Sequence, residues 1–543
     1  MVFARRSTTL LAAIIASCAM VLSLTACTSD NKTVVDGQTT VTSNSAGGVA
    51  VFTPSDGITL NQQTPLNKWA KLVPDLAKAL ADAGFKKGDI DHTTSDSLAK
   101  QSRAIQDFVV DHLSNNTTDD SGIAIAPDNM TLLVAPVVEA DASTRQYGDY
   151  VSQNLSTNDA TDGEATSDGE SSEDDSSKDD SSNTESDSTA SDEQAQAVDR
   201  LVSSLKLAKE SGMHVVLLGN SIEGYKPDAF VKFSDAQTIG KLQAEKMVSK
   251  LKLDKASKDN PKYIEVLLPY TAVDEKGNAN DSTFAQEAFR GIWQVLGSYY
   301  QKGVVESPSG TLDGKSTEND WQAVAYDAAK EGSTAKALDK RLAKTDGQST
   351  LTRIDGIITM NDYIASEVVK ELDDLGYTGS AADINPQITI SGIVGNITGK
   401  KDLSRDAVPD PIKSPENDNA NDSSSSDDDA DEDTSASDKD RDSQWPLVTG
   451  YGAYVSNIPS IVNGKQWMTG MEDRQTIATD IAQACAKLNK DEALNSMPSI
   501  RNSEVGGVKK IPTISEPLLA VSASNLKSAL IDPGYISLAD AGL

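Results

Sequence analysis

Short apolar stretches alternate with amphipathic helical stretches along most of this chain, and no other feature constrains its fold as strongly. In the helical stretch at residues 67–83, for example, Trp69, Leu72 and Leu76 fall on one face at spacings of three and four. An apolar run without polar alternation is typical of a strand in a parallel sheet that helices cover on both faces. We therefore expect an α/β fold, with strands at residues 49–53, 131–137, 214–219, 229–233, 263–269, 354–360, 387–394 and 446–450.

Glycines mark the ends of several predicted helices. Gly84, Gly212 and Gly376 each follow a helical run, where a left-handed C-terminal cap is needed and glycine adopts it without steric cost. In open parallel sheets, ligands bind beyond the carboxyl ends of the strands. Functional side chains are therefore expected in the loops that follow residues 53, 136, 219, 269, 360 and 450.

The chain begins with the layout of a bacterial export signal. Arg5 and Arg6 precede an apolar run at residues 10–24 that is too short for an ordinary membrane-spanning helix. The sequence LTAC at residues 24–27 then matches the lipobox, in which the cysteine thiol accepts a diacylglycerol before cleavage on its N-terminal side. We therefore expect Cys27 to be the lipid-modified first residue of the mature protein.

This anchor predicts where the protein resides. Residues 1–26 would be removed as a signal peptide, and residues 27–47, rich in Ser, Thr, Asn and Gly, would form a flexible tether. The diacyl or triacyl group of a bacterial lipoprotein anchors a protein stably. The mature chain is therefore expected on the cell membrane, facing the extracellular or periplasmic side.

Two acidic low-complexity runs carry most of the formal net charge of -33. Residues 156–194 include 14 acidic and 1 basic residues, and residues 402–443 include 15 acidic and 4 basic residues. Both runs lack the apolar side chains that repay the entropy of ordering, so both are expected to be disordered insertions. The rest is an ordinary acidic protein, which argues against a nucleic-acid partner.

The size of the remaining sequence predicts two lobes. About 415 residues remain without the signal, the tether and the acidic runs, which is more than one compact core usually holds. We therefore expect two doubly wound, Rossmann-like lobes with a ligand cleft between them.

The cysteines exclude an intramolecular disulfide in the mature chain. Of the three cysteines, Cys18 is removed with the signal and Cys27 is lipidated, so that only Cys485 keeps a free thiol. Cys485 shares a helical face with Ile477 and Ile481 and is expected to be a small buried residue.

Catalytic signatures are absent from the sequence. It contains no CxxC, HExxH, Walker A or GxSxG motif and only three histidines. His214 opens a predicted buried strand, whereas His92 and His112 lie in polar surroundings and are expected at the surface. We therefore predict that the chain is not an enzyme and holds neither a cofactor nor a metal ion.

The residues that follow the predicted strands are mostly amides, carboxylates and aromatics. They include Lys68, Trp69, Asn220, Ser221, Asn280, Asp281, Asn361 and Asp362. Amides and carboxylates form directed hydrogen bonds with hydroxyl groups, and an indole stacks on the C–H face of a pyranose, so this set suits a sugar. Two structural alternatives stay open: Asn361 and Asp362 could cap the next helix, and Trp69 could belong to the core.

Four stretches in the same order resemble the type I periplasmic binding proteins, most closely the xylose-binding branch of the sugar-binding components of ABC importers. The first, at residues 195–248, includes HVVLLGNSI and DAFVKFSDAQTIGKLQAEKMV. The others are IDGIITMNDYIASEVVKELDDLGYTG after Arg353, VNGKQWMTGMEDRQTIATDIA after Ile461 and IPTISEPLLAVSASNLKSAL after Lys510. The resemblance covers about 400 residues, interrupted by the acidic runs, and implies two lobes that close on a ligand.

The resemblance also implies ligand contacts. The family's Arg-Trp pair before the first long helix corresponds to Lys68-Trp69, its Asn-Asp pair corresponds to Asn361-Asp362, and its stacking tryptophan corresponds to Trp321. Lysine keeps the positive charge of the arginine but loses its planar fork.

Other positions depart from the family pattern. Asn220-Ser221 replaces an Asp-Arg pair, and Tyr451 and Gly452 replace a glutamine and an aspartate. Losing an arginine and an aspartate removes two charge-assisted hydrogen bonds, each worth roughly 1.5 to 3 kcal/mol, which is enough to change the ligand that binds.

Lobe boundaries follow from the same resemblance. The N-terminal lobe is expected at residues 48–232 and again at 451–505, and the C-terminal lobe at residues 233–450 and 506–543. Three crossing segments would join the lobes, near residues 228–233, 450–454 and 504–512.

Two functions are compatible with this sequence. The first is a lipid-anchored monomer that captures a monosaccharide, xylose-like, or a short oligosaccharide and delivers it to an ABC permease with a separate ATPase. The second is a sensor or cell-envelope interaction module that reuses the fold with altered or lost sugar specificity. An enzymatic function has the least support, because no catalytic constellation accompanies the fold.

Overall fold

A computed structural model describes residues 34–35, 38–39, 46–55, 65–115, 125–138, 145–150, 153–156, 185–273, 280–343, 350–381 and 445–543. The chain divides into two compact units, Met1–Asn44 and Ser45–Leu543. In the first unit, β1 (Val34–Val35) and β2 (Gln38–Thr39) form an antiparallel pair.

Several predicted features lie outside the described residues. They are the signal peptide, the lipidated Cys27, most of the tether, the strand at residues 387–394, the acidic run at 402–443 and most of the run at 156–194. For these segments the sequence-based predictions stand as predictions.

A seven-stranded sheet forms the first lobe of the second unit. Its strands, in order across the sheet, are β17 (Ile500–Val505), β18 (Val508–Ser515), β9 (Ala229–Lys232), β7 (His214–Leu218), β5 (Met130–Val134), β3 (Gly48–Pro54) and β4 (Ile90–Ser95). β17 runs antiparallel to β18, and the remaining pairs are parallel. The predicted parallel sheet is therefore confirmed.

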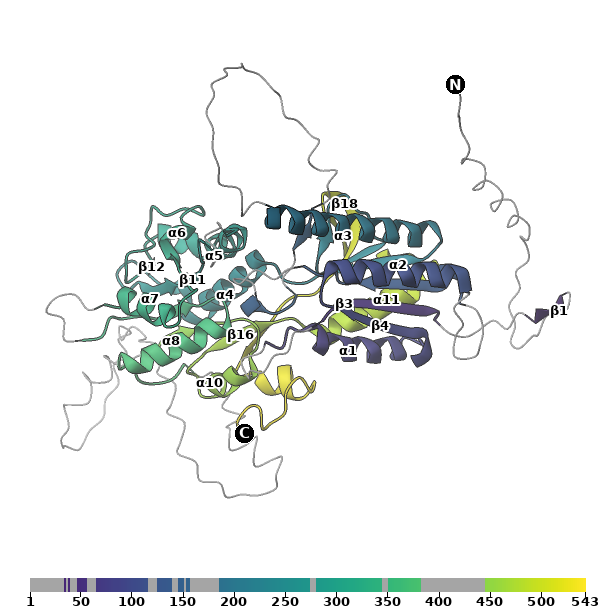
Figure 1. The fold of residues 1–543 in the computed structure, drawn as a ribbon. Coiled ribbons are helices and arrows are strands. Elements are labelled where there is room, and N and C mark those ends of the chain that lie inside the picture. Colours follow the sequence, from purple (N-terminus) through teal and green to yellow (C-terminus); the bar gives the residue numbers. More distant parts are fainter. Residues whose placement is uncertain are drawn as a thin grey trace, which may run out of the picture. The chain divides into compact units, whose positions relative to one another are not determined.

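Helices cover both faces of this sheet (Figure 1). They are α1 (Trp69–Asp82) and α11 (Arg474–Leu488) on one face, and α2 (Leu98–Asn115) and α3 (Glu185–Glu210) on the other. Successive residues of a strand point to opposite faces, so Val49 and Val51 enter the core under α1 and α11, whereas Ala50 and Phe52 enter the other core. This is why β3 is apolar at successive positions from Val49 to Phe52.

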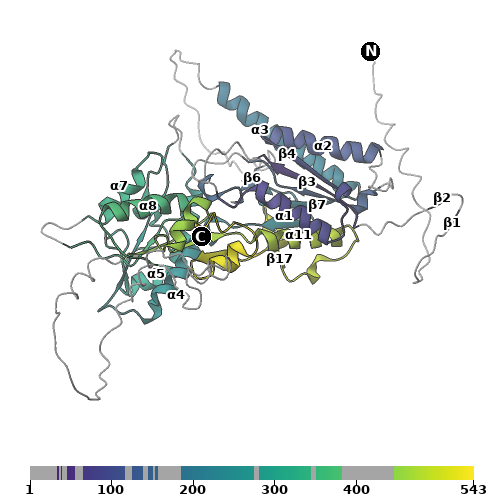
Figure 2. The ribbon, with the colours of Figure 1, turned by 90° about the horizontal axis from the view of Figure 1, so that it is seen from below.

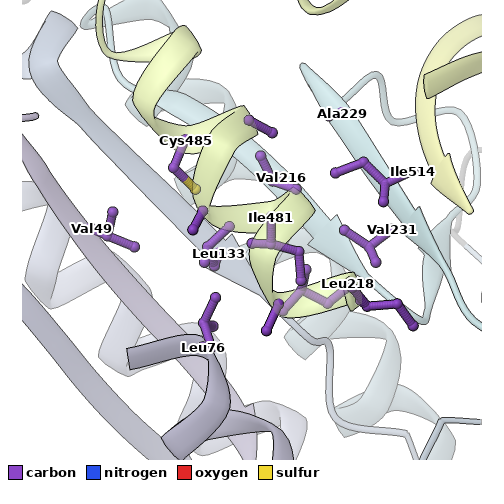
Figure 3. Close-up of a cluster of buried hydrophobic side chains, with 14 of the residues drawn as sticks. Val49, Leu76, Leu133, Val216, Leu218, Ala229, Val231, Ile481, Cys485 and Ile514 are labelled. Carbon is purple, nitrogen blue, oxygen red and sulfur yellow. The ribbon is translucent and has the colours of Figure 1, made fainter. Parts of the chain in front are cut away.

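The core under α1 and α11 contains the free cysteine. Figure 3 shows Ile481 and Cys485 of α11 in one cluster with strand residues such as Leu133 and Val216. The side chain of Cys485 is fully buried, as its helical spacing predicted.

A four-stranded parallel sheet forms the second lobe. Its strands, in order, are β12 (Val305–Glu306), β10 (Lys262–Val266), β14 (Gly356–Ile358) and β15 (Leu447–Val448). The helices around it are α4 (Ala236–Leu251), α5 (Thr283–Gln301), α7 (Ser333–Arg341) and α8 (Asp362–Asp374). Ile358 packs into the core with α4 and α5, whereas its neighbour Ile357 packs into the core with α7 and α8. Figure 2 shows these two pairs of helices on opposite sides of the lobe. The predicted pair of doubly wound α/β lobes is thus confirmed.

Short elements complete the fold. They are β6 (Asn154–Leu155) paired with β8 (Ser221–Ile222), β11 (Leu268–Pro269) paired with β13 (Ala325–Tyr326), β16 (Met468–Met471) paired antiparallel with β19 (Leu519–Ser522), and the helices α6 (Trp321–Val324) and α10 (Ile458–Val462). The predicted glycine caps are also found, because Gly84, Gly212 and Gly376 have φ of 99°, 99° and 90°.

The structure differs from three sequence-based expectations. Helix α3 begins at Glu185, so residues 185–194 of the predicted disordered run are helical, because a helix propagates cooperatively from its packed part. His112 is buried rather than at the surface, and its ring stacks 5.9 Å from that of Phe108. Residues 508–515, expected in the C-terminal lobe, form β18 of the first sheet, because Gly506 and Gly507 turn the chain back antiparallel to β17.

Candidate functional site

Two places in the fold bring predicted site residues together. One is a buried polar contact region that joins the carboxyl ends of strands in the two lobes. The other is a pocket beside Trp321 in the second lobe.

Lys68 and Trp69 lie at the start of α1 and both contact Asp149. Lys68 Nζ is 2.7 Å from Asp149 Oδ1, and the backbone N–H of Trp69 donates to Asp149 Oδ2 at 3.0 Å. The Trp69 ring is buried edge-on against Tyr150 and Phe233, at centroid distances of 5.1 and 5.7 Å. Trp69 therefore occupies the core, which was its structural alternative, and Lys68 is already paired with a carboxylate.

Asn220 and Ser221 follow β7 and hold neighbouring loops together. Asn220 Nδ2 donates to the carbonyl of Pro136 at 2.9 Å, and Asn220 Oδ1 accepts from the backbone N–H of Gln153 at 2.9 Å. Ser221 Oγ donates to Asn154 Oδ1 at 2.8 Å. Both side chains thus bind the chain itself at the carboxyl edge of the first sheet.

Asn361 caps α8 and also reaches across to another segment. Its Oδ1 accepts from the backbone N–H of Ile364 at 2.9 Å, as expected of an N-cap, and its Nδ2 donates to Gln146 Oε1 at 3.1 Å. The preceding residue, Met360, has φ of 69° although it is not glycine. Such a backbone conformation is costly and is typical of positions that the surrounding structure fixes for function.

Asp362 is fully buried at the centre of a hydrogen-bond network. Its Oδ1 accepts from Gln466 Nε2 at 2.7 Å, and its Oδ2 accepts from Thr469 Oγ1 and from the backbone N–H of Tyr454, each at 2.9 Å. Burial raises the pKa of Asp362 to about 6, although these hydrogen bonds favour the charged form. Asp362 therefore fixes the crossing segment that contains Tyr454 against α8.

Tyr451 lies beside a second buried carboxyl group, that of Glu472. The Tyr451 hydroxyl donates to Glu472 Oε1 at 3.3 Å, and the same oxygen accepts from the backbone N–H of Ser234 at 2.7 Å and from Ser234 Oγ. Burial raises the pKa of Glu472 to about 7 and that of Tyr451 well above its usual value. The contact joins the segments after β9 and β16, which both lie between the lobes.

Glu472, Gln466 and Gln146 were not among the predicted site residues. Glu472 carries the one available signal, because it stands directly after the buried strand MTGM, at its carboxyl end. Gln146 lies in a polar segment without periodicity, and its sequence gives no indication of these contacts.

A cavity of about 340 Å³ lies beside Trp321. Its lining residues are Tyr270, Thr271, Ala272, Val273, Trp321, Gln322, Ala325, Tyr326 and Asp327. The rings of Tyr270 and Trp321 meet edge-on with centroids 5.1 Å apart, and Thr271 Oγ1 donates to Asp327 Oδ1 at 3.1 Å. Aromatic faces next to an amide and a carboxylate are suited to a ligand with both C–H and hydroxyl groups.

Asn280 and Asp281 lie outside the lining of this pocket. Asn280 Nδ2 donates to the carbonyl of Thr271 at 2.9 Å, and the Tyr270 hydroxyl donates to the carbonyl of Asn280 at 3.2 Å. Asp281 accepts from the backbone N–H of Thr283 at 2.9 Å in the first turn of α5. Asn280 therefore positions the pocket wall, whereas Asp281 binds the start of α5.

Within the described part of the chain, no group of three or more His, Cys, Asp or Glu residues could hold a metal ion. Among the same residues, no helix combines the length and the apolarity that crossing a membrane requires.

The sequence matches no protein-family model and no curated protein. The structure is similar, at low sequence identity, to sugar solute-binding proteins of ABC transporters. A solute-binding protein from Clostridium phytofermentans with bound beta-D-glucose is 16% identical, with a TM-score of 0.44, over 91% of this chain and 99% of that chain. A carbohydrate transporter solute-binding protein from Chloroflexus aurantiacus in complex with D-glucose is 18% identical, with a TM-score of 0.43, over 91% of this chain and 98% of that chain. A periplasmic ribose ABC transporter protein from Conexibacter woesei is 13% identical, with a TM-score of 0.42, over 90% of this chain and 96% of that chain.

Proposed function

We propose that this protein is a lipid-anchored, extracytoplasmic binding protein that captures a sugar and delivers it to an ABC importer with a separate ATPase. The observation that carries the proposal is the pocket beside Trp321, whose volume of about 340 Å³ is that of a small-molecule site. Tyr270 and Trp321 supply apolar ring surface, and Gln322 and Asp327 supply directed hydrogen-bonding groups. A pyranose or furanose needs both kinds of contact.

The position of the pocket supports the same proposal. It lies next to β11 and β13, at the carboxyl side of the second lobe's strands, where open parallel sheets bind their ligands. The four sequence stretches that resemble sugar-binding components of importers run through both lobes. Glucose, xylose and short oligosaccharides of such sugars are therefore the first ligands to test.

A thermal-shift screen tests the sugar. Pentoses, hexoses and short oligosaccharides are added to the purified chain, and a ligand that binds the folded state raises the melting temperature by mass action. Trp321→Ala should abolish the shift, whereas Tyr299→Ala, which removes an aromatic ring outside the pocket, should leave it intact. The proposal fails if no sugar in the panel stabilises the protein.

Membrane attachment is tested separately. Because the lipobox cysteine is the proposed acceptor of the lipid, Cys27→Ala should move the protein from the membrane fraction to the soluble fraction. If the variant still sediments with membranes, the anchor lies elsewhere.

One observation favours the second function, a sensor or cell-envelope interaction module. Lys68 and Asn361, both predicted sugar contacts, bind Asp149 and Gln146 of the same chain. A protein whose cleft groups are satisfied internally has fewer groups to offer a sugar. This function gains support if no sugar binds to the wild type or to a variant in which a Gly-Ser sequence replaces residues 145–150.

A further inference from the structure

A six-residue segment, residues 145–150, contacts both lobes at the place where their strand ends meet; we call it the strap. Its first turn is a 3-10 helix (Arg145–Tyr147). We infer that the strap occupies the interlobe site in place of a ligand and holds the two lobes closed. The strap must then withdraw before a ligand can reach Lys68 and Asn361. The inference rests on the proposed function, because a sugar in the pocket beside Trp321 could extend its contacts to Lys68 and Asn361 only after the strap has released these two side chains.

The strap binds the first lobe through Asp149 and Tyr150. The Asp149 carboxylate pairs with Lys68 and accepts from the backbone N–H of Trp69, and thereby caps α1, for which Lys68 provides no side-chain cap. The backbone N–H of Asp149 donates to the carbonyl of Asn67 at 2.8 Å. The Tyr150 hydroxyl donates to the carbonyl of Lys68 at 2.5 Å, and its ring stacks 4.7 Å from that of Phe233.

The strap binds the second lobe through Gln146 and Tyr147. Gln146 Oε1 accepts from Asn361 Nδ2, and the Gln146 carbonyl accepts from the Tyr454 hydroxyl at 2.6 Å. The Tyr147 ring lies 4.6 Å from that of Phe284 and is 1% exposed. Burial raises the pKa of Tyr147 well above its usual value, and a hydrogen bond with Asn361 opposes this rise. The strap thus satisfies the side chain of a predicted ligand contact in each lobe.

The two tyrosines tie the cores of different lobes together. Tyr150 belongs to the core under α1 and α11, whereas Tyr147 belongs to the core with α4 and α5. They are three residues apart, so their Cα atoms can separate by at most roughly 11 Å. The lobes cannot open widely at this point while both rings stay buried.

Gly148, between the tyrosines, fits the strap tightly against the first lobe. Its φ is +96°, and a Cβ at this position would lie 2.5 Å from the carbonyl oxygen of Asn67. A side chain at position 148 would therefore displace the strap from its contact with Asn67. The strap also adjoins the proposed sugar pocket, because Tyr147 and Trp321 belong to the same buried cluster, against which Tyr270 of the pocket lining packs.

A strapless variant, in which Gly-Ser-Gly-Ser-Gly-Ser replaces residues 145–150, separates the strap from the pocket. Spin labels on the exposed residues Lys78 of α1 and Lys246 of α4, each changed to Cys in a chain that also carries Cys18→Ala and Cys27→Ala, report the distance between the lobes. Cys485 is fully buried and should stay unlabelled. Without ligand, the strapless chain should give a longer and broader distance distribution than the wild type. An unchanged distribution would overturn the inference.

Sugar affinity supplies the second readout. A site that is open in only a fraction of molecules binds with an affinity reduced by that fraction, so removing the strap should tighten binding of a sugar from the panel at least tenfold. Tyr147→Ala should act in the same direction, and Tyr299→Ala should change neither readout. Equal affinity in wild-type and strapless chains would contradict the strap but support the sugar function. Opening without binding of any sugar would support the strap and contradict the sugar function.

Discussion

Replacing Glu472 by Gln should remove a large part of the pH dependence of stability. Glu472 is 1% exposed, and burial raises its pKa from 4.5 to about 7. The folded state therefore binds a proton more tightly than the unfolded state, so the free energy of unfolding falls as the pH rises between these two values. At about 1.4 kcal/mol per pH unit, this single group costs the folded state roughly 3 kcal/mol at pH 8 relative to pH 4.

The glutamine variant keeps the contacts but cannot ionise. Its amide oxygen can still accept from Ser234 and Tyr451, as Glu472 Oε1 does in the wild type. Glu472→Gln should therefore match the wild type near pH 4.5 and exceed its stability at pH 8. Asp362, whose pKa is about 6, should leave a smaller fall in both proteins.

Urea unfolding followed by circular dichroism at several pH values between 4.5 and 8 measures this difference. Glu318→Gln, at an exposed position, is the matched control and should keep the slope of the wild type. If Glu472→Gln and the wild type lose the same free energy of unfolding over this range, Glu472 titrates alike in the folded and unfolded states, contrary to its burial.

Two further perturbations probe the packing around the site. Gly450→Ala should lower the free energy of unfolding in urea by about 2 kcal/mol or more, because a Cβ at this position would lie 2.1 Å from Asp362 Oδ1 in a packed region. A neutral effect would mean that the Asp362 network can yield to the added methyl group. The Cys485 thiol should not react with a thiol reagent at pH 8 until the protein unfolds, because the thiol is fully buried and burial raises its pKa. Rapid labelling of Cys485 in the folded chain would contradict its place in the core.

The sequence predicted the elements whose side chains are buried on both faces. β3, β5 and β7 are mostly apolar, so the predicted bounds of these strands differ from the observed ones by at most three residues. β4 has the sequence IDHTTS at the edge of the sheet and is mostly exposed, so it carries no such signal. β17 also lies at an edge and has four polar residues in its sequence IRNSEV.

The predicted site residues were placed less well than the strands, because their partners are distant in the sequence. Ser234 and Glu472 are 238 positions apart, and Asn361 and Gln146 are 215 apart. Because Asn361 and Asp362 follow a predicted strand, the sequence placed them at the carboxyl edge of a sheet, where the structure has them. The sequence could not show that Asp149 and Gln146 would pair with Lys68 and Asn361, two expected ligand contacts.

The order of the strands bears on how this chain is made. Strands of the second lobe's sheet come from residues 262–448, a continuous stretch, whereas the first lobe's sheet needs β3 near the start and β18 near the end. The second sheet can therefore assemble during synthesis, but the first lobe stays incomplete until residue 515 has left the ribosome. For a chain expected to cross a membrane unfolded, the same order applies as it emerges on the far side, so the first lobe is the last part of the protein to close.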